Sequence, residues 1–230
     1  MSWVPLLCKS DYSLGLSINR TKNLALRCKE LGYTACAITE RANVFSAVNF
    51  SDDIIKQGIK PILGSEFYAA DLSGNLTRLN ILARNHAGWK RLVKMTTDAN
   101  KNDADRPYLD YHKLGDYVDE NLICITGQIG SFLGNSLFGV PRAALHSDYE
   151  GAKSLVKSDW KTVGSDNIFS LKSLFGDRLF LQINFSDKDT FPANEIISKA
   201  LRYLGRITNT KCVAAPESFY LHKADAQDQW

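Results

Sequence analysis

Residues 8–68 contain, in order, the segments CKSDYSL (8–14), TACAIT (34–39), ERANVF (40–45) and GIKPILGSEFY (58–68). Two of these segments hold short apolar runs that end in polar residues, and an amphipathic stretch lies between the runs. This order predicts a strand, a helix and a second strand. In α/β proteins the chemistry is placed at the carboxyl ends of parallel strands. A functional site is therefore expected to involve Lys9, Asp11, Glu40, Arg41 and Glu66.

The same alternation of strand and helix continues along the chain. Residues 142–175 are expected to form a helix that is interrupted at Gly151 and Gly164, and residues 73–75 a turn. The chain has no linker and no repeat of fixed period, so residues 1–230 are expected to form one parallel α/β domain. Residues 222–230 are expected to begin a helix that is truncated at residue 230. Further strands are expected at 3–8, 76–84, 122–126, 178–184 and 211–215, and helices at 17–31, 44–57, 87–100 and 193–208.

Composition excludes several classes of protein. With 44% hydrophobic and 23% charged residues among 230, the chain is typical of a globular protein rather than a disordered one. Its net charge of +3 is too small to indicate nucleic-acid binding by itself. No apolar run approaches the roughly 20 residues that cross a bilayer. The five cysteines are odd in number and lack CxxC spacing, which predicts reduced thiols in a cytoplasmic protein.

Several segments, in order, resemble one known family. They are KSDYSL (9–14), ITERANVF (38–45), GIKPILGSEFYAA (58–70), LNILARNHAGWKRL (79–92), ITGQIG (125–130), FGDRLFLQI (175–183) and VAAPESFYLHKADA (213–226). This succession resembles the PHP (polymerase and histidinol phosphatase) domain, in the form that opens the alpha subunit of bacterial DNA polymerase III. The resemblance covers nearly the whole chain. It implies a distorted seven-stranded β/α barrel.

The resemblance also implies a cluster of divalent metal ions at the strand ends, where metal-bound water attacks a phosphoester. The family supplies imidazole and carboxylate ligands from successive strands. This sequence departs from that pattern at nearly every ligand position. Glu66, in the GxE motif, is the one ligand that is kept. Leu7 and Lys9 stand at the positions of the family's His-x-His motif, and Glu40 and Arg41 at those of its Asp-His motif. Arg78 stands where the family has a later His, and Gln128 where it has a Cys or His. Glu217 and Phe219 stand at the positions of the last motif, Asp-x-His.

The replacements change the charge of the site. Lys9, Arg41 and Arg78 place cations where the family would bind metal ions, and a cation repels a metal and pairs with nearby acids. We therefore expect a vestigial metal site in which ion pairs to Glu40, Glu66 and Glu217 replace the metals. No cofactor is expected; the alternative is a zinc or manganese site with an unusual ligand set.

Two functions follow from the resemblance, and a third follows from basic residues on a predicted helix. The first is a non-catalytic domain of DNA replication that serves as a structural or docking module, either as part of a polymerase or as a stand-alone relative that binds the replisome. Its partners would be replisome proteins, either the polymerase or the proofreading exonuclease, with weak or indirect contact to DNA and none to a membrane. The alternative is a metal-dependent phosphoesterase or 3′–5′ exonuclease that uses Glu40, Glu66 and Glu217. The third is a weak DNA-binding accessory domain that uses Lys90, Arg91 and Lys94 on a helix face.

Overall fold

The computed structural model describes residues 3–70, 76–101, 107–138, 148–185 and 191–227. By their contacts, the residues form two compact units. Unit 1 comprises Met1–Phe67, Asn80–Leu109 and Pro216–Trp230, and unit 2 comprises Tyr68–Leu79 and Asp110–Ala215. The expectation of a single domain over residues 1–230 stays a prediction.

Unit 1 is built on parallel strands. Strand β1 (Leu7–Cys8) lies between β2 (Ala35–Arg41) and β9 (Glu217–Ser218), and β2 also pairs with β3 (Lys60–Ala70). The β2–β3 register runs from Ala35 opposite Lys60 to Arg41 opposite Glu66. The five central residues of β2 are buried, as expected for a parallel strand that is covered on both faces. This register brings the polar ends of β2 and β3 together.

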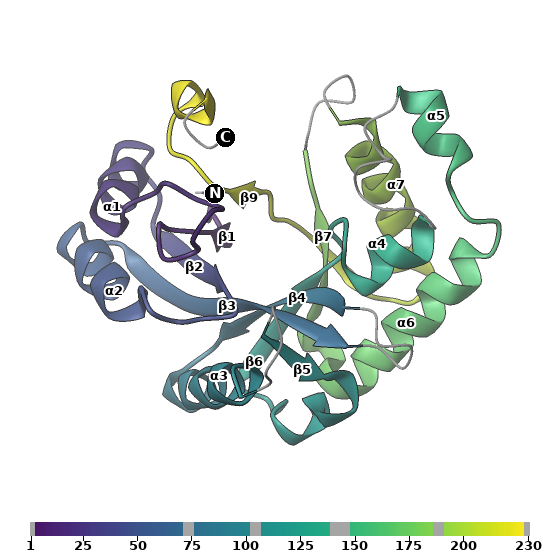
Figure 1. The fold of residues 1–230 in the computed structure, drawn as a ribbon, viewed down its shortest axis with the longest axis horizontal. Helices are drawn as coiled ribbons and strands as arrows, with labels where there is room; N and C mark the ends of the chain where they lie inside the picture. The colour runs from purple at the N-terminus through teal and green to yellow at the C-terminus, as the bar shows by residue number, and fades with distance from the viewer. Residues whose placement is uncertain (1–2, 71–75, 102–106, 139–147, 186–190, 228–230) are drawn as a thin grey trace. The chain divides into compact units, whose positions relative to one another are not determined.

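Three α-helices accompany these strands: α1 (Thr21–Glu30), α2 (Ala47–Lys56) and α3 (His86–Ala99). Helices α1 and α2 lie side by side (Figure 1). Leu24 of α1 and Phe50 of α2 are buried with Ile38 of β2 in one apolar core. Helix α3 follows β4 (Leu76–Ala83) and begins where the Asn85 side chain accepts a hydrogen bond of 3.1 Å from the Gly88 N–H.

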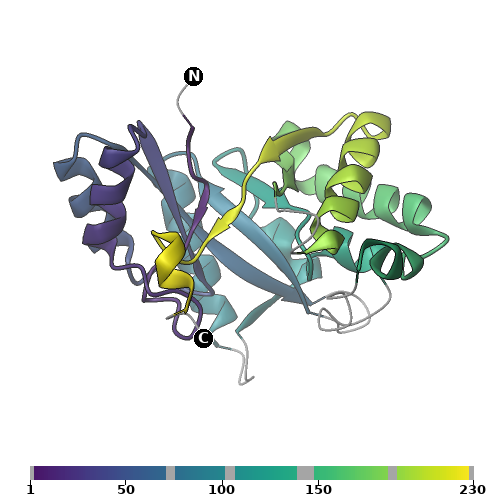
Figure 2. The same cartoon turned by 90° about the horizontal axis from the view of Figure 1, so that it is seen from above.

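Unit 2 has a parallel group of three strands, with β7 (Leu179–Ile183) between β6 (Leu122–Thr126) and β8 (Lys211–Ala214). Its helices, which are drawn in shades of green in Figure 2, contact one another. Strand β5 (Tyr108–Asp110), of which Tyr108 and Leu109 belong to unit 1, and the 3₁₀ helix η1 (Tyr111–Asp116) of unit 2 precede β6. The helices are α4 (Phe132–Leu137), α5 (Tyr149–Ser154), α6 (Trp160–Phe175), with η3 (Gly176–Arg178) after it, and α7 (Pro192–Ile207).

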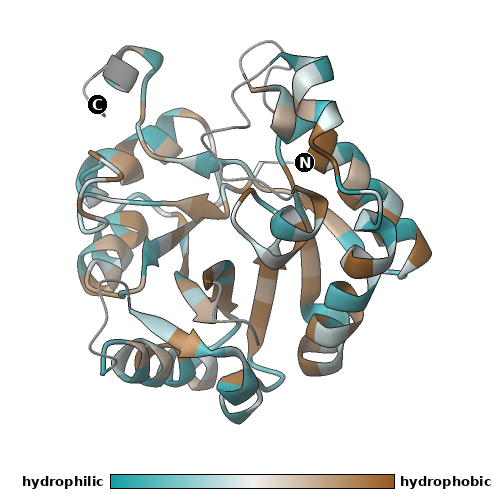
Figure 3. Ribbon diagram, turned by 45° about the vertical axis from the view of Figure 1, so that its right-hand side comes forward, coloured by the Kyte–Doolittle hydropathy of each residue, from teal (hydrophilic) through white to brown (hydrophobic). Residues whose placement is uncertain are grey.

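Hydropathy follows this organisation. In Figure 3 the strands carry long brown stretches, while the helices alternate between brown and teal along their length. Helix α7 shows the pattern clearly: Ile197, Leu201 and Leu204 are buried, while Arg202 and Arg206 are exposed. Such helices are stabilised mainly by burial of their apolar face against the sheet and neighbouring helices.

The predicted elements differ from the observed ones at several places. The strand expected at 3–8 is limited to Leu7–Cys8, because Pro5 has no N–H to donate, although its carbonyl accepts from Ala37. The helix expected from residue 17 begins at Thr21, because the Ser17 hydroxyl and the Asn19 amide bind the Lys9 carbonyl instead.

The helix expected over 142–175 is two helices, α5 and α6, and the interruption lies at residues 155–159 rather than at the glycines. Gly164 lies inside α6, where a Cβ would stand 2.8 Å from Leu204, so close packing explains this glycine. Residues 142–147, and the turn expected at 73–75, lie outside the described residues. The final segment forms the 3₁₀ helix η4 (Lys223–Gln227). None of the helices in the described part of the chain has the length and apolar character needed to span a bilayer.

Candidate functional site

Glu66, at the end of β3, is the centre of a buried ion-pair cluster in unit 1. Its Oε2 lies 3.2 Å from Lys9 Nζ, and its Oε1 lies 2.7 Å from Arg41 Nε. Lys9 and Glu66 have no exposed side-chain surface, and the Arg41 side chain is 26% exposed. Lys9 Nζ also donates a hydrogen bond of 2.9 Å to the Thr39 carbonyl. Both oxygens of this carboxylate are thus engaged by cations, as a buried acid requires.

Glu40, next to Arg41 on β2, is held by hydroxyl groups rather than by a cation. Its Oε1 accepts from Ser46 Oγ at 2.7 Å and from Ser10 Oγ, and its Oε2 accepts from Ser13 Oγ. The Ser10 backbone N–H donates to both oxygens at 3.2 Å. The expected ion pair to Glu40 is not formed among the described residues. We call Ser10, Ser13 and Ser46 the serine cage.

The serine cage comes from two segments of the sequence. Ser10 and Ser13 lie in the loop after β1, and Ser46 lies just before α2. Ser13 Oγ has a second role, since it accepts a hydrogen bond of 3.0 Å from the Arg41 backbone N–H. The cage therefore fixes the backbone that carries Arg41 and fills the acceptor sites of Glu40.

The residues of this cluster do not fit a divalent metal ion. A metal needs carboxylate oxygens or imidazole nitrogens with free lone pairs that converge on one point. Here the two oxygens of Glu66 face an ammonium and a guanidinium, and those of Glu40 accept from the cage. Within the described residues, no group of three or more His, Cys, Asp or Glu side chains is arranged to hold a metal ion. The expectation of no cofactor stays a prediction.

Arg78 and Gln128 lie in unit 2. The Arg78 backbone N–H donates to the Gly130 carbonyl at 3.0 Å, and its guanidinium donates to the Ile129 carbonyl at 2.5 Å. The side chains of Arg78 and Gln128 are both buried. The Gln128 side-chain amide has no hydrogen-bond partner at either its oxygen or its nitrogen among the described residues. A buried amide of this kind is normally satisfied by an ordered water molecule.

The other predicted positions belong to unit 1. Leu7 is fully buried and stands opposite Glu217 in the β1–β9 pairing. Phe219 contributes its carbonyl, which accepts from Ser17 Oγ at 2.8 Å. Asp11 is not part of the Glu66 cluster: it is exposed, and it lines a shallow surface groove with Asp52 and Asp53.

Sequence reasoning missed the serine cage. The signal was present, since Ser10 and Ser13 flank the polar end of the first strand and Ser46 precedes an amphipathic stretch. Serine at such positions is common in loops and helix caps, so the residue type alone does not mark a carboxylate partner.

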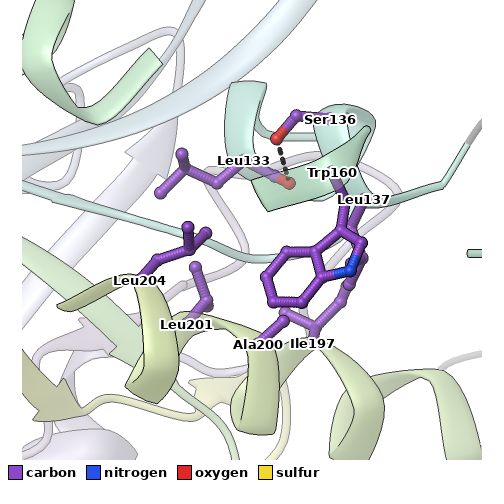
Figure 4. Close-up of a pocket in the computed structure, with 8 residues that line it drawn as sticks. All are labelled: Leu133, Ser136, Leu137, Trp160, Ile197, Ala200, Leu201 and Leu204. Carbon is purple, nitrogen blue, oxygen red and sulfur yellow. Dashed lines mark hydrogen bonds between the residues drawn. The ribbon is translucent and has the colours of Figure 1, made fainter. Parts of the chain in front are cut away.

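Unit 2 also contains a small cavity between α4, α6 and α7, drawn in Figure 4. Its lining is apolar apart from Ser136, whose hydroxyl donates to the Leu133 carbonyl at 2.8 Å. The cavity volume is about 10 Å³, which is barely the room of one water molecule. It is a packing defect of the core and not a ligand pocket.

Comparison with known proteins agrees with this fold. The family model of the PHP domain matches residues 6–170. The DNA polymerase III alpha subunit of Borreliella burgdorferi is 30% identical over 99% of this chain and 19% of its own length. The corresponding subunit of Aquifex aeolicus is 26% identical over 97% of this chain and 19% of its own length. The chain thus spans about a fifth of the length of these relatives.

Two solved structures share the fold at low sequence identity. One is described as a metal-dependent phosphoesterase from Bifidobacterium adolescentis, with a TM-score of 0.52, 10% identity, and coverage of 95% of this chain and 88% of that one. The other is an amidohydrolase from Chromobacterium violaceum with bound sulfate and no metal, with a TM-score of 0.55, 8% identity, and coverage of 94% and 87%. The predicted α/β fold of the PHP barrel type is confirmed by this likeness.

Proposed function

Because this chain belongs to the PHP domain family and is related to the alpha subunit of DNA polymerase III, we propose that it is a non-catalytic PHP domain, which acts in DNA replication as a structural and protein-docking module. Ion pairs and hydroxyl contacts take the place of metal ions in its site. Replisome proteins, the polymerase or its proofreading exonuclease, are the proposed partners.

The proposal is based on the two ion pairs of Glu66, whose Oε2 lies 3.2 Å from Lys9 Nζ and whose Oε1 lies 2.7 Å from Arg41 Nε. Metal-dependent phosphoester hydrolysis requires a metal ion that lowers the pKa of a water molecule and binds the phosphate oxygens. An ammonium and a guanidinium beside the acid oppose metal binding by charge repulsion. An ammonium and a guanidinium have no lone pair to offer a metal, because both groups act only as hydrogen-bond donors.

Retention of the fold supports the docking role. Loss of catalytic ligands removes one reason to keep a barrel, yet Glu40 and Glu66, at the ends of β2 and β3, are buried and bonded through both carboxylate oxygens. Breaking such a buried pair by removing one partner costs about 3–5 kcal/mol. The cluster thus serves the stability of unit 1, which is what a structural module requires.

Metal content and hydrolysis together test the non-catalytic part of the proposal. The protein is purified without chelator, incubated with manganese or zinc, desalted, and analysed by mass spectrometry alongside a phosphodiester hydrolysis assay. We expect substoichiometric metal and no turnover. Stoichiometric metal, with turnover that Glu66→Gln abolishes, would show instead that the chain is a metal-dependent phosphoesterase or exonuclease.

A restored variant gives this test a positive control. Lys9→His and Arg41→His together return two imidazoles to the site and remove both cations from Glu66. If the barrel can still hold a metal, this double variant should bind more zinc or manganese than the wild-type chain. Circular dichroism establishes that the variant is folded before its metal content is compared.

Docking is tested separately with purified partners. Sedimentation of the chain with the proofreading exonuclease subunit from the same organism should show a complex. Absence of a complex with both the exonuclease and the polymerase core would refute the docking role and leave the metal result unaffected.

A further inference from the structure

Helix α7 and the strand that follows it form a cationic groove on the surface of unit 2. The groove is open, has a volume of about 750 Å³, and is lined by Arg202, Arg206, Lys211, Asn209 and Cys212 over a floor at Gly205. We call it the α7–β8 groove. Residues 192–214 carry four basic residues and one acidic residue, a net charge of +3 that equals the charge of the whole chain.

The cations of this groove have no acidic partners among the residues that the structure describes. Across the described part of the chain, neither guanidinium nor the Lys211 ammonium forms an ion pair with a carboxylate. The one acid of the segment, Glu195, lies 2.6 Å from Lys199 Nζ, outside the groove. The groove therefore presents three positive charges that no described carboxylate compensates.

Ordinary helix stabilisation explains only part of this charge. Arg206 lies in the last turn of α7, where a cation is favourable near the negative end of the helix dipole. The last carbonyls are already satisfied in part, since Lys172 Nζ donates to the carbonyls of Thr208 and Asn209 at 3.0 Å and 2.8 Å. Arg202 and Arg206 are four residues apart on one face, and such a pair of like charges destabilises a helix slightly. An external anion would remove this repulsion.

The groove is preformed by tight packing. The opposite face of α7 is fixed in the core, where Ile197, Leu201 and Leu204 face α4 and Trp160 (Figure 4). At Gly205, a Cβ would lie 2.8 Å from the Thr210 carbonyl, so only glycine allows β8 to approach this closely. The helix therefore holds its arginines on a rigid support.

An aromatic residue, Tyr203, is the sequence neighbour of Arg202, although its side chain does not line the groove. Tyr203 is 36% exposed and lies between Arg202 and Arg206 in the sequence. Its ring packs edge-on against Trp160 at 5.7 Å between centroids, and Lys161 Nζ lies 5.1 Å from its centre. Proteins that bind single-stranded nucleic acids combine a positive groove along the phosphates with aromatic side chains that contact bases.

From these features we infer that the α7–β8 groove binds the phosphodiester backbone of single-stranded nucleic acid. Arg202, Arg206 and Lys211 contact successive phosphates, and guanidinium groups suit this role because they donate two parallel hydrogen bonds to phosphate oxygens. The inference uses no residue of the Glu66 cluster, so it does not depend on the proposed function.

Fluorescence anisotropy with a labelled oligonucleotide of about 12 nucleotides tests the inference. Three phosphate contacts predict a slope of about −2 in log K against log salt, or about 20-fold weaker binding at 200 mM than at 50 mM salt. The variant Arg202→Gln, Arg206→Gln, Lys211→Gln should lose at least about tenfold in affinity at low salt and most of the slope.

A charge-matched control separates a local site from diffuse attraction. Lys22→Gln, Lys29→Gln and Lys60→Gln remove three exposed cations from unit 1 and leave the groove intact. This control should bind within about twofold of the wild type. Equal loss in both triple variants, or no loss in the groove variant, would overturn the inference.

Cys212 provides a readout at the groove itself. It is the one exposed cysteine of the five, because Cys8, Cys28, Cys36 and Cys124 are buried. Bound oligonucleotide should slow alkylation of Cys212, and unchanged alkylation at saturating oligonucleotide would overturn the assignment of the site. A polyglutamate peptide of similar length should compete poorly. Competition equal to that of unlabelled oligonucleotide would assign the groove to an acidic protein partner instead.

Discussion

Replacing Lys9 with methionine removes a buried cation and keeps a side chain of similar length. The change keeps the contact between Glu66 and Arg41 Nε at 2.7 Å, and it removes the hydrogen bond of 2.9 Å that Lys9 Nζ donates to the Thr39 carbonyl. Removing one member of a buried ion pair costs about 3–5 kcal/mol. Because Arg41 still neutralises the carboxylate, we expect a loss near the lower limit, about 3 kcal/mol.

Urea unfolding followed by circular dichroism measures this loss as a change in the free energy of unfolding. Lys101→Met is the matched control, because Lys101 pairs with Asp98 at 2.7 Å while 70% and 24% of their side chains are exposed. Exposed pairs contribute about 0–1 kcal/mol, so the control should lose far less than Lys9→Met.

A double-mutant cycle isolates the pair. Glu66→Gln in the Lys9→Met background removes the acid that the first change left undercompensated. We expect the double variant to be less destabilised than the sum of the two single variants by about 1 kcal/mol or more. A loss below about 1 kcal/mol for Lys9→Met, or simple additivity, would refute the view that this ion pair stabilises unit 1.

Two further predictions concern other buried groups. Ser13→Ala should lower the free energy of unfolding in urea by about 2–3 kcal/mol, and by more than Ser46→Ala does. The reason is that the Ser13 hydroxyl bonds both Glu40 and the Arg41 N–H, whereas the Ser46 hydroxyl bonds Glu40. Equal losses in the two variants would contradict this order. Burial raises the pKa of the Cys124 thiol above its ordinary value of 9.0. The free energy of unfolding that the neutral buried thiol contributes is therefore complete below pH 9.0, and it falls by about 1.4 kcal/mol for each pH unit above it. Unfolding at pH 8 and pH 10 should therefore differ more in the wild type than in Cys124→Ala, and an identical pH dependence would count against this cause.

Much of the fold could be predicted because its signals are local. The apolar run before Glu40 and the one before Glu66 predict two parallel strands, and both form as β2 and β3. The meeting of Arg41 and Glu66 follows from strand ends that share an edge. Strands β1 and β9 have two residues each, too few to carry a periodic signal, and α4 has six.

The site could be predicted only in part, because its bonds depend on tertiary structure. Glu40 accepts from serines that are 30, 27 and 6 residues away in the sequence. No spacing rule connects a carboxylate to hydroxyls at such distances. The cations in the sequence predicted an ion pair for each acid. Glu66 forms such pairs, whereas Glu40 accepts hydrogen bonds from neutral serine hydroxyls instead.

The position of β1 between β2 and β9 has a consequence for folding during synthesis. The β1–β2 pairing joins residues 30 apart, while Leu7 and Glu217 are 210 positions apart, so β1 stays a free edge until the ribosome has released the distal segment. A nascent chain that ends before residue 217 would expose the backbone of β1 to intermolecular pairing. Ribosome-stalled fragments of increasing length should accordingly lose their tendency to aggregate once this last strand has emerged.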